Sequence, residues 1–417
     1  MLGLEQRVIG RLQALRATAP LPLRVRLWQG DEVAMSDNPS VTLHLRSPAA
    51  ALRLLDPSLH ALGEAYVEGL LDVDGPVTAA IDIASHLART TRVRPQIGRL
   101  PRWLQRHSRR SDRAAIAYHY DVSNDFYRLF LDPRMVYSCA YYRRGDEDLA
   151  TAQLQKLDHV LCKLKLGPGQ RLLDIGCGWG ALVIRAAERY GVQAVGITLS
   201  ENQYVLARER VAQAGLSDRI DIRLQDYRDI PPEGGFDRIA SIGMFEHVGL
   251  ANLGAYFRRI HELLKPGGIA MNHGITSASI DSRWVGLGGG EFIDRYVFPD
   301  GELPHVSLAI RELSAAGLEL ADAESLRHHY ALTLAAWSSA FERNKAQLQQ
   351  IAGERTTRIW RVYLAGCAHA FAHGWINLYQ LLAFRPTEDQ DGLQSPLPLT
   401  RDYMYRDASL PALTPDR

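Results

Sequence analysis

The chain has 417 residues, of which 46% are hydrophobic, and its formal net charge is +1. This length predicts more than one domain, and the apolar fraction suffices for ordinary globular cores. The near-zero net charge gives no sign of a nucleic-acid partner, and the lack of any run of about 18 apolar residues excludes a membrane-spanning helix.

Residues 1–90 are predicted to form a small α+β domain. The opening helix carries Arg7 and Arg11 within its apolar pattern, so it is not a secretory signal. Its apolar stripe suits packing into a core and leaves interfacial membrane binding open: Leu4, Val8, Leu12 and Leu15. Alternating runs predict strands and amphipathic runs predict helices, the strands at 23–30 and 40–47 and the helices at 49–69 and 77–89.

An arginine-rich stretch follows this domain. Residues 86–113 contain nine arginines and a single acid, Asp112. Such a stretch suits a solvated linker, and it also suits a patch that meets anionic phosphate on a membrane or a polynucleotide. We assign 91–116 to a linker and 117–417 to a second, larger domain.

Strands and helices alternate from about residue 150. Buried strands are predicted at 171–177, 192–200, 219–227, 236–245 and 267–275, and the helices between them at 180–191, 201–215 and 252–268. This order indicates an α/β fold with a doubly wound, mostly parallel sheet, whose strands all end at one ligand-binding edge. Further helices are predicted at 332–351 and 358–384.

The four cysteines show no metal-type pairing, because the nearest two are fifteen residues apart: Cys139, Cys162, Cys177 and Cys367. In a chain of this size without a signal peptide, they are expected to be reduced thiols of a cytosolic protein. We therefore predict no metal site.

A glycine-rich loop links the first large-domain strand to the next helix. The stretch DIGCGWG places Asp174 two residues before Gly176, with Gly178 and Gly180 following. Glycines allow a tight turn and close backbone approach, and a helix N-terminus favours negative charge. An acid at this spacing can hold the amino group of S-adenosylmethionine, whereas dinucleotide folds use a different glycine spacing.

Polar side chains end the second and third strands. The usual ribose-binding acid of NAD enzymes is missing from the second, which ends in neutral groups that can still border a ribose: Thr198, Leu199, Ser200 and Gln203. The third ends in groups that would border an adenine: Gln225, Asp226 and Tyr227. Asp226 can accept from the exocyclic amine or simply cap a helix.

Several linked motifs point to one family. The stretches YHYDVSNDFYRLFLDPRMVYSCAYY, SIGMFEHVG and NHGITS, together with DIGCGWG and GITLSENQ, resemble the cyclopropane-fatty-acid synthase family. FIDRYVFPDGELP and HHYALTLAAW fit it as well, and the leading domain looks like that of the phospholipid-acting members. The resemblance covers residues from about 117 to the C-terminus and implies a Rossmann-like class I methyltransferase.

The family transfers the sulfonium methyl of S-adenosylmethionine to a cis double bond of an acyl chain. Attack by the alkene leaves a carbocation, and loss of a proton from the added methyl closes a cyclopropane ring. Such a site needs an apolar tunnel, groups that stabilise a cation, and a base. The same first step with a different proton loss gives a methyl- or methylene-branched lipid, and another lipid alkene can be the acceptor.

The resemblance implies that the base is a bound bicarbonate and that five residues form its site: Cys139, Glu246, His273, Ile275 and Tyr330. It also implies that Tyr137 and Ser138 contact the methionine end of the cofactor. Cys367 falls where the family places an active-site cysteine, but methyl transfer needs no thiol, so we interpret it as a packing residue near the acyl channel.

The residues alone leave other interpretations open. Glu246 and His273 can anchor loops, and Tyr330 can be a core tyrosine. Cys139, Glu246, His247 and His273 could together bind a metal, although their spacing fits no familiar zinc pattern. A lipid-binding protein with a vestigial fold would have lost the glycine loop or Glu246, and both are intact.

Taken together, the sequence predicts a cytoplasmic enzyme that is peripherally associated with the inner face of the membrane. Its substrate would be an unsaturated phospholipid in the bilayer, held by the leading domain and the arginine-rich stretch. Family resemblance implies a homodimer, and we expect no nucleic-acid partner.

Overall fold

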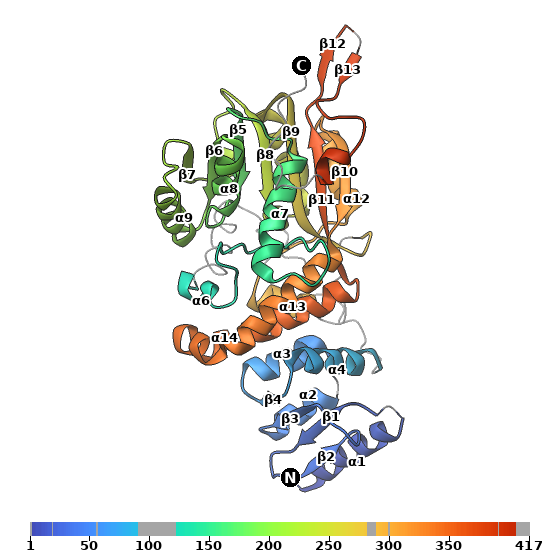
Figure 1. The fold of residues 1–417 in the computed structure, drawn as a ribbon. Coiled ribbons are helices and arrows are strands. Elements are labelled where there is room, and N and C mark those ends of the chain that lie inside the picture. Colours follow the sequence, from blue (N-terminus) through green and yellow to red (C-terminus); the bar gives the residue numbers. More distant parts are fainter. Residues whose placement is uncertain are drawn as a thin grey trace.

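The computed structural model describes residues 2–18, 20–55, 57–90, 122–281, 289–298, 301–390 and 392–405. The linker predicted at 91–116 lies outside the described residues. Figure 1 shows a large sheet at one end of the molecule, two helices that lie side by side beneath it, and the N-terminal elements at the other end.

Residues 2–90, the N-terminal region, contain their own sheet. Its strands lie in the order β2-β1-β3-β4, with β1 and β3 parallel. The elements in chain order are α1 (Leu2–Thr18), β1 (Leu23–Arg26), β2 (Glu32–Ala34), β3 (Val41–Leu45), α2 (Pro48–Leu55), α3 (Leu59–Val67), β4 (Leu71–Asp74) and α4 (Val77–Thr90). Val8 and Leu12 of α1 are buried in the core beneath this sheet.

The single helix expected at 49–69 is wrong, because two helices occupy that stretch. Pro57 lies between them, and proline cannot donate the backbone hydrogen bond that a continuous helix requires. α3 then begins afresh, with the Ser58 side chain accepting from the Ala61 amide.

The large sheet has seven strands in the order β10-β11-β9-β8-β5-β6-β7. The strands are β5 (Arg171–Ile175), β6 (Gln193–Thr198), β7 (Ile220–Leu224), β8 (Phe236–Ile242), β9 (Leu264–Ser277), β10 (Glu319–Ser325) and β11 (Ile376–Phe384). The five strands from β5 to β9 pair in parallel, whereas β11 pairs antiparallel with both β9 and β10. The predicted α/β fold with a mostly parallel sheet is confirmed.

The helix expected at 358–384 is wrong in its second half. α14 (Lys345–Ala372) ends near Gly374, whose φ of 69° suits glycine better than other residues. The chain then forms β11, which lies between β9 and β10. A nine-residue apolar run fits a buried strand or a buried helix equally well, so periodicity could not separate them.

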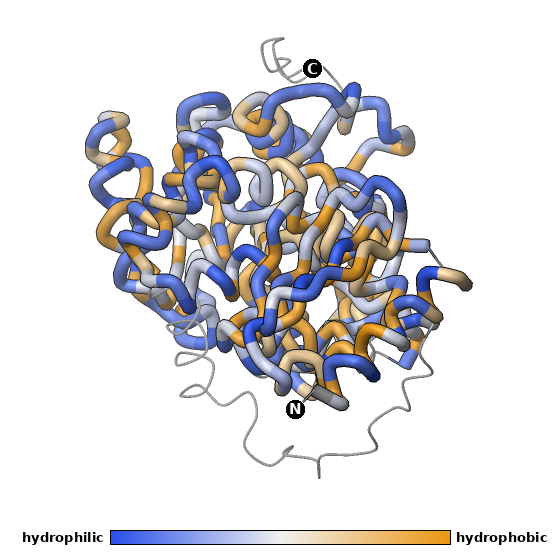
Figure 2. The backbone as a smooth tube through the Cα atoms, turned by 90° about the horizontal axis from the view of Figure 1, so that it is seen from below, coloured by the Kyte–Doolittle hydropathy of each residue, from blue (hydrophilic) through white to orange (hydrophobic). Residues whose placement is uncertain are grey.

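Helices cover both faces of the sheet. α7 (Leu149–Lys163), α8 (Ala181–Tyr190) and α9 (Glu201–Gln213) pack on one face. α10 (Leu253–Leu263) and α12 (Val306–Ala315) pack on the other, which gives a three-layer arrangement. Hydrophobic and hydrophilic residues alternate at short intervals along the helical parts of the chain, as expected when only one side of a helix is buried (Figure 2).

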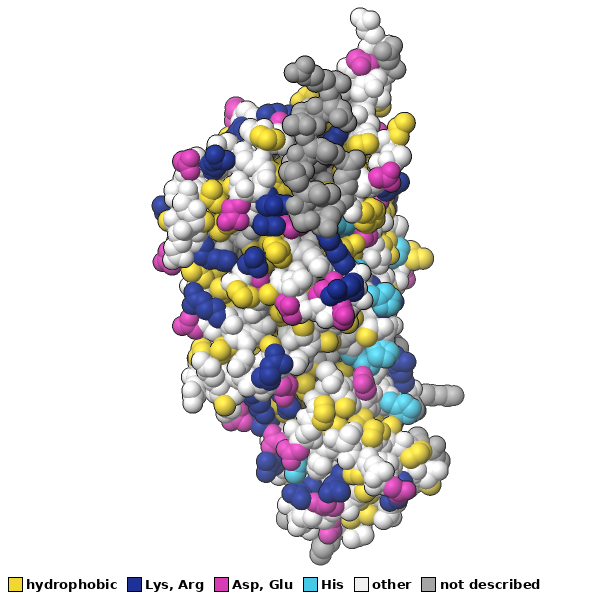
Figure 3. Space-filling model, in the orientation of Figure 1, with side chains coloured by type: hydrophobic (Ala, Val, Ile, Leu, Met, Phe, Trp, Pro, Cys, Tyr) yellow, Lys and Arg dark blue, Asp and Glu magenta, His cyan; other side chains and the backbone are white. Residues whose placement is uncertain are grey.

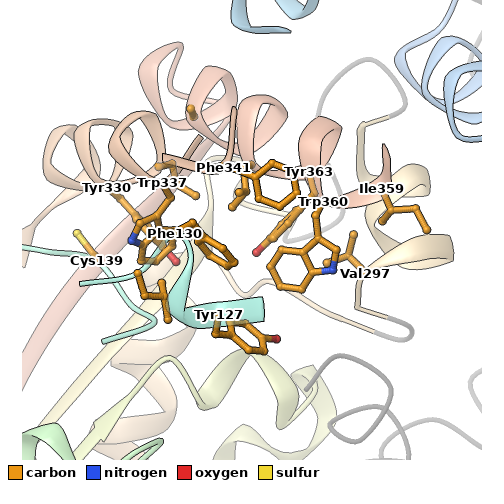
Figure 4. Packing of buried hydrophobic residues seen from close by; sticks show 14 of the residues in the cluster. Tyr127, Phe130, Cys139, Val297, Tyr330, Trp337, Phe341, Ile359, Trp360 and Tyr363 are labelled. Atoms are coloured by element: carbon orange, nitrogen blue, oxygen red, sulfur yellow. The ribbon is translucent and has the colours of Figure 1, made fainter. Parts of the chain in front are cut away.

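An aromatic cluster lies at the carboxyl edge of the sheet. It joins α6 (Asn124–Arg128), α13 (Arg327–Arg343) and α14. Figure 4 shows Tyr127 and Phe130 near Trp360, whose ring centre lies 5.5 and 5.8 Å from theirs, and Trp337 beside Tyr330. Trp337 is fully buried.

Short elements complete the described chain. They are α11 (Gly289–Tyr296), β12 (Thr387–Asp389), β13 (Gly392–Gln394) and the 3-10 turns η1 (Tyr227–Asp229), η2 (Phe245–His247), η3 (Leu250–Asn252) and η5 (Asp402–Tyr405).

The N-terminal region docks against α14 through arginines. Arg358 pairs with Asp72, donates to the Tyr66 carbonyl at 2.9 Å, and places its guanidinium 4.8 Å from the Tyr66 ring centre. Arg361 donates to the Tyr66 hydroxyl at 3.0 Å. These contacts tie α14 to the end of α3 and to β4.

No helix among the residues that the structure describes is long and apolar enough to cross a membrane. On the face drawn in Figure 3, charged side chains of both signs lie among scattered hydrophobic ones.

Candidate active site

The glycine loop after β5 bends sharply at the carboxyl edge of the sheet. Gly176, Gly178 and Gly180 have φ values of 82°, 54° and 83°, a region that strains other residues. The amides of Gly176 and Cys177 both donate to the Ile197 carbonyl of β6, at 3.0 and 2.9 Å. The loop is therefore held between β5 and β6, with its backbone open to a ligand.

A cavity of about 140 Å³, the smaller cavity, adjoins this loop. All the residues predicted to bind the cofactor line it except Gly180 and Ser200. Gly180 precedes α8 as its N-cap, and the Ser200 hydroxyl accepts from the Gln203 amide at the start of α9. Those two residues shape the helix starts that border the cavity.

Asp174 and Lys156 are buried ionisable residues that both line the smaller cavity. Burial raises the pKa of Asp174 and lowers the pKa of Lys156, and the attraction between the two charges opposes both shifts. The Lys156 ammonium donates to the Ser138 hydroxyl at 3.1 Å, while one carboxylate oxygen of Asp174 has no partner among the described residues. Such an oxygen is suited to accept from a ligand's ammonium group.

Both neutral and charged side chains border the part of the smaller cavity away from Asp174. Thr198 donates to the Gln203 side-chain oxygen at 2.8 Å. Asp226 caps η1 by accepting from the Arg228 amide, and its carboxylate pairs with the Arg228 guanidinium at 2.6 Å. The helix-cap interpretation of Asp226 thus holds, while the residue still lines the cavity.

A second cavity of about 280 Å³, the larger cavity, lies next to the smaller one. All six predicted catalytic residues line it, including Cys367. Tyr137, Ser138, Gly243 and His247 line both cavities, so a ligand in one lies next to a ligand in the other.

Glu246 projects from η2 toward β9. One of its carboxylate oxygens accepts from the Ile275 amide at 2.7 Å, and the other is buried without a partner among the described residues. Burial raises the pKa of Glu246 to about 7. The group therefore carries a proton part of the time near neutral pH, and it can donate or accept a hydrogen bond.

His273 lies within β9, beside Glu246. Gln380 of β11 places its amide nitrogen 3.2 Å from Nδ1. With the amide in this orientation Nδ1 accepts the hydrogen bond and Nε2 carries the ring proton. That Nε2 is buried without a partner in the described structure. Burial lowers the pKa of His273 well below its usual value, so the ring is neutral.

Two cysteines and a tyrosine complete the wall of the larger cavity. Burial raises the pKa of the Cys139 thiol far above its usual value and that of Cys367 to about 12, so neither is a thiolate at neutral pH. Tyr330 stands near Phe371, with ring centres 4.6 Å apart.

Sequence reasoning missed two residues of the site, Lys156 and Gln380. Both are polar residues in buried stretches of regular structure, the first on α7 and the second on β11, and both are 2% exposed or less. The sequence signal for Lys156 is a charged residue at a position where the helix pattern predicts an apolar one. Gln380 could not be identified because the stretch around it was assigned to a helix. Within the described ranges, no three histidine, cysteine, aspartate or glutamate side chains cluster so as to hold a metal ion.

Comparison with known proteins identifies the family. The family model described as mycolic acid cyclopropane synthetase matches residues 107–381. The chain belongs to this family. A second model, of a domain of unknown function, matches residues 12–92. Members of the mycolic acid cyclopropane synthetase family are S-adenosylmethionine-dependent methyltransferases, which confirms the family predicted from the sequence motifs.

Three similar proteins represent this family. A probable fatty acid methyltransferase of Pseudomonas putida is 48% identical over 93% of this chain and 97% of its own. Cyclopropane-fatty-acyl-phospholipid synthase of Escherichia coli K12 is 35% identical over 86% of this chain and 91% of its own. The structure of mycolic acid cyclopropane synthase CmaA1 with SAH and CTAB is 39% identical, with a TM-score of 0.62, over 65% of this chain and 98% of that one.

The smaller cavity fits the cofactor of this family. The unpartnered Asp174 oxygen suits an ammonium group, the left-handed glycines expose backbone, and Thr198, Gln203 and Gln225 offer neutral polar groups to a nucleoside. When bound there, S-adenosylmethionine supplies an electrophilic methyl group.

Proposed function

We propose that this protein methylates the cis double bond of unsaturated phospholipid acyl chains and closes a cyclopropane ring. The observation that carries the proposal is the shared wall of the two cavities, at Tyr137, Ser138, Gly243 and His247. A methyl donor in the smaller cavity would meet an alkene in the larger one. The phospholipid acceptor is supported by the name of the Escherichia coli relative, whose match covers 86% of this chain, more than the residues 107–381 that the family model matches.

The walls of the larger cavity suit a reaction that passes through a cation. Rings of Tyr330, Tyr363 and Phe371 line it, and aromatic faces stabilise positive charge without reacting with it. The neutral thiols of Cys139 and Cys367 do not compete for the methyl group, because only a thiolate is a good nucleophile. The wall therefore favours attack by the alkene.

We further propose that bicarbonate, held by Glu246 and His273, removes the proton that closes the ring. Both residues present a buried, unpartnered polar atom in the larger cavity, namely a carboxyl oxygen and the Nε2 nitrogen. Glu246 in its protonated form and His273 can each donate a hydrogen bond to an anion. Gln380 keeps the His273 ring in the tautomer that donates.

The location and assembly of the protein are part of the same proposal. We infer that it is cytoplasmic and binds the inner face of the membrane through its N-terminal region and its arginine-rich stretch. We also propose a homodimer, and a division into domains at 1–90 and 117–417 with a linker at 91–116. Liposome binding should weaken as salt is raised, and binding that ignores salt would refute the electrostatic part.

A methylated product without a ring is the second candidate, since the Pseudomonas putida relative is named a fatty acid methyltransferase. The first step is the same. Loss of a proton from the added methyl closes the ring, whereas a 1,2-hydride shift that moves the cation to the methyl-bearing carbon before that loss gives a methylene group, and loss of a proton from a chain carbon gives a methyl-branched alkene. Ring and methylene products have the same mass, so NMR of the extracted lipid must accompany mass spectrometry.

Turnover of methyl-labelled S-adenosylmethionine on vesicles of unsaturated phospholipid tests the proposal. We expect label in the acyl chains and a loss of roughly 100-fold or more in the Glu246→Gln variant, in line with losses on removing a catalytic hydrogen-bonding group. Glu201→Gln, on the exposed first turn of α9, is the control. An unchanged rate in Glu246→Gln would refute the role of this residue, and label confined to other lipids would refute the phospholipid substrate.

A further inference from the structure

The larger cavity does not end at the catalytic residues. From Glu246 and His273 it passes α14 and continues into the N-terminal region. There its wall is formed by the sheet of that region, through Leu43 and Val73, and by α3 and α4. The hydrophobic interior of the N-terminal region and the candidate active site thus border one continuous space.

The two ends of this cavity differ in chemistry. Among the described residues of the N-terminal region, every lining side chain is apolar except that of Tyr66, whose hydroxyl already accepts from Arg361 at 3.0 Å. Arg361 and His369 of α14 line the cavity beside the N-terminal region, and both are already paired, with Glu342 and Asp82. Glu246 and His273 stand at the catalytic end. Within the described part of the chain, the inner end therefore has no free polar side chain that could bind an ester or a charged headgroup.

Small residues on α4 leave room at this inner end. Val77, Ala80, Ala84 and Leu87 recur at helical spacing and line the cavity, so they form one face of α4. The two alanines lie one turn apart in the middle of that face. Larger side chains at those positions would fill the space.

The wall is held in place by close packing. The ring of Phe292 on α11 lies against Gly63 of α3, where an added Cβ would come within 2.8 Å of it. Arg358 and Arg361 fix the end of α3 to α14. The inner end is thus a built part of the molecule that two separate regions of the chain enclose.

We propose that the N-terminal region receives the methyl-terminal segment of the acyl chain whose double bond lies beside Glu246 and His273. This inference rests on the proposed function and names the part of the substrate that the N-terminal region binds. The methyl end is the segment that can enter an apolar pocket without leaving polar groups unpaired, whereas the ester must stay near polar partners or water. Ala80 and Ala84 then set the length that the pocket accepts.

The test compares phospholipid vesicles whose chains share a cis bond at the ninth carbon but total fourteen, sixteen or eighteen carbons. Only the segment beyond the double bond differs among them. In Ala84→Phe and Ala80→Leu we expect the rate with eighteen carbons to fall roughly tenfold relative to fourteen, because a filled pocket can no longer bury the last methylene groups. Thr78→Phe, on the exposed face of α4, should keep the wild-type ratio.

A second measurement does not depend on turnover. A fatty acid with a photoreactive diazirine at its methyl end should crosslink to α3 or α4 in the full-length protein, and a probe with the diazirine beside the carboxyl group should not. Crosslinks there support the inference even if wild-type protein fails to methylate phospholipid, an outcome that would refute only the proposed function. Unchanged chain-length ratios in both variants, or methyl-end crosslinks confined to residues outside the N-terminal region, would overturn the inference.

Discussion

Glu246→Gln should change the way in which the stability of the ligand-free protein depends on pH. Burial raises the pKa of Glu246 from an ordinary value of 4.5 to about 7. The folded state therefore binds a proton more tightly than the unfolded state, and the wild type loses stability as the pH rises between these two values. At about 1.4 kcal/mol per pH unit the full loss is ~3 kcal/mol, and the glutamine variant does not suffer it.

Urea unfolding of both proteins at about pH 5 and at about pH 8 measures this effect. We expect the free energy of unfolding of Glu246→Gln, relative to wild type, to rise by ~2–3 kcal/mol from the lower to the higher pH. Taking the difference between the two proteins removes the contributions of the other titratable groups, because both proteins contain them. Burial raises the pKa of Glu246, and hydrogen bonds from backbone amides lower it. The surface control Glu201→Gln should vary by less than about 0.5 kcal/mol. A difference that is constant with pH would show that the Glu246 carboxyl is not desolvated, and its proposed role as a proton-bearing donor would fail.

Lys156→Met removes the buried ammonium that donates to Ser138, so SAH should bind roughly 10- to 100-fold more weakly in calorimetry, while the exposed Lys165→Met should bind normally. Equal affinity in both variants would remove Lys156 from the site. Gly176→Ala places a side chain on a φ of 82° and should cost about 1–2 kcal/mol in urea unfolding besides weakening SAH binding, and a fully stable variant would contradict the strain. Arg358→Ala should destabilise the protein by about 2 kcal/mol and make the N-terminal region more sensitive to protease, with SAH affinity unchanged. Unaltered cleavage would show that this arginine does not hold the two regions together.

The sequence predicted the parts of the fold that depend on local pattern. Alternating strands and helices gave the parallel part of the sheet, and the reasoning that parallel strands end at one edge brought Glu246 and His273 near each other. Their geometry agrees, since Glu246 accepts from Ile275, two residues beyond His273. The glycine loop was equally readable, because its conformation is a property of the glycines themselves.

What the sequence did not predict depends on tertiary contacts. β11 is a nine-residue apolar run whose preference for a strand comes from pairing with β9 and β10. Gln380 could not be placed while that run was assigned to a helix. Lys156 follows the amphipathic pattern of α7, and its burial becomes apparent only when Asp174 and Ser138 lie beside it. The continuation of the larger cavity into the N-terminal region likewise exists only once α4 and α14 are packed together.

The position of β11 also governs the order in which the protein can be assembled on the ribosome. In the folded sheet β9 and β10 are not neighbours, because β11 lies between them, and β11 (376–384) is the last of the seven strands to be synthesised. Gln380, which contacts the His273 ring, is synthesised more than a hundred residues after it. Contacts between residues so far apart in the sequence form slowly during folding. The N-terminal region has its own sheet and core, so it can form early during synthesis. Before α14 is synthesised, the apolar pocket of the N-terminal region is uncovered. A nascent chain at that stage exposes a hydrophobic surface of the kind that chaperones bind.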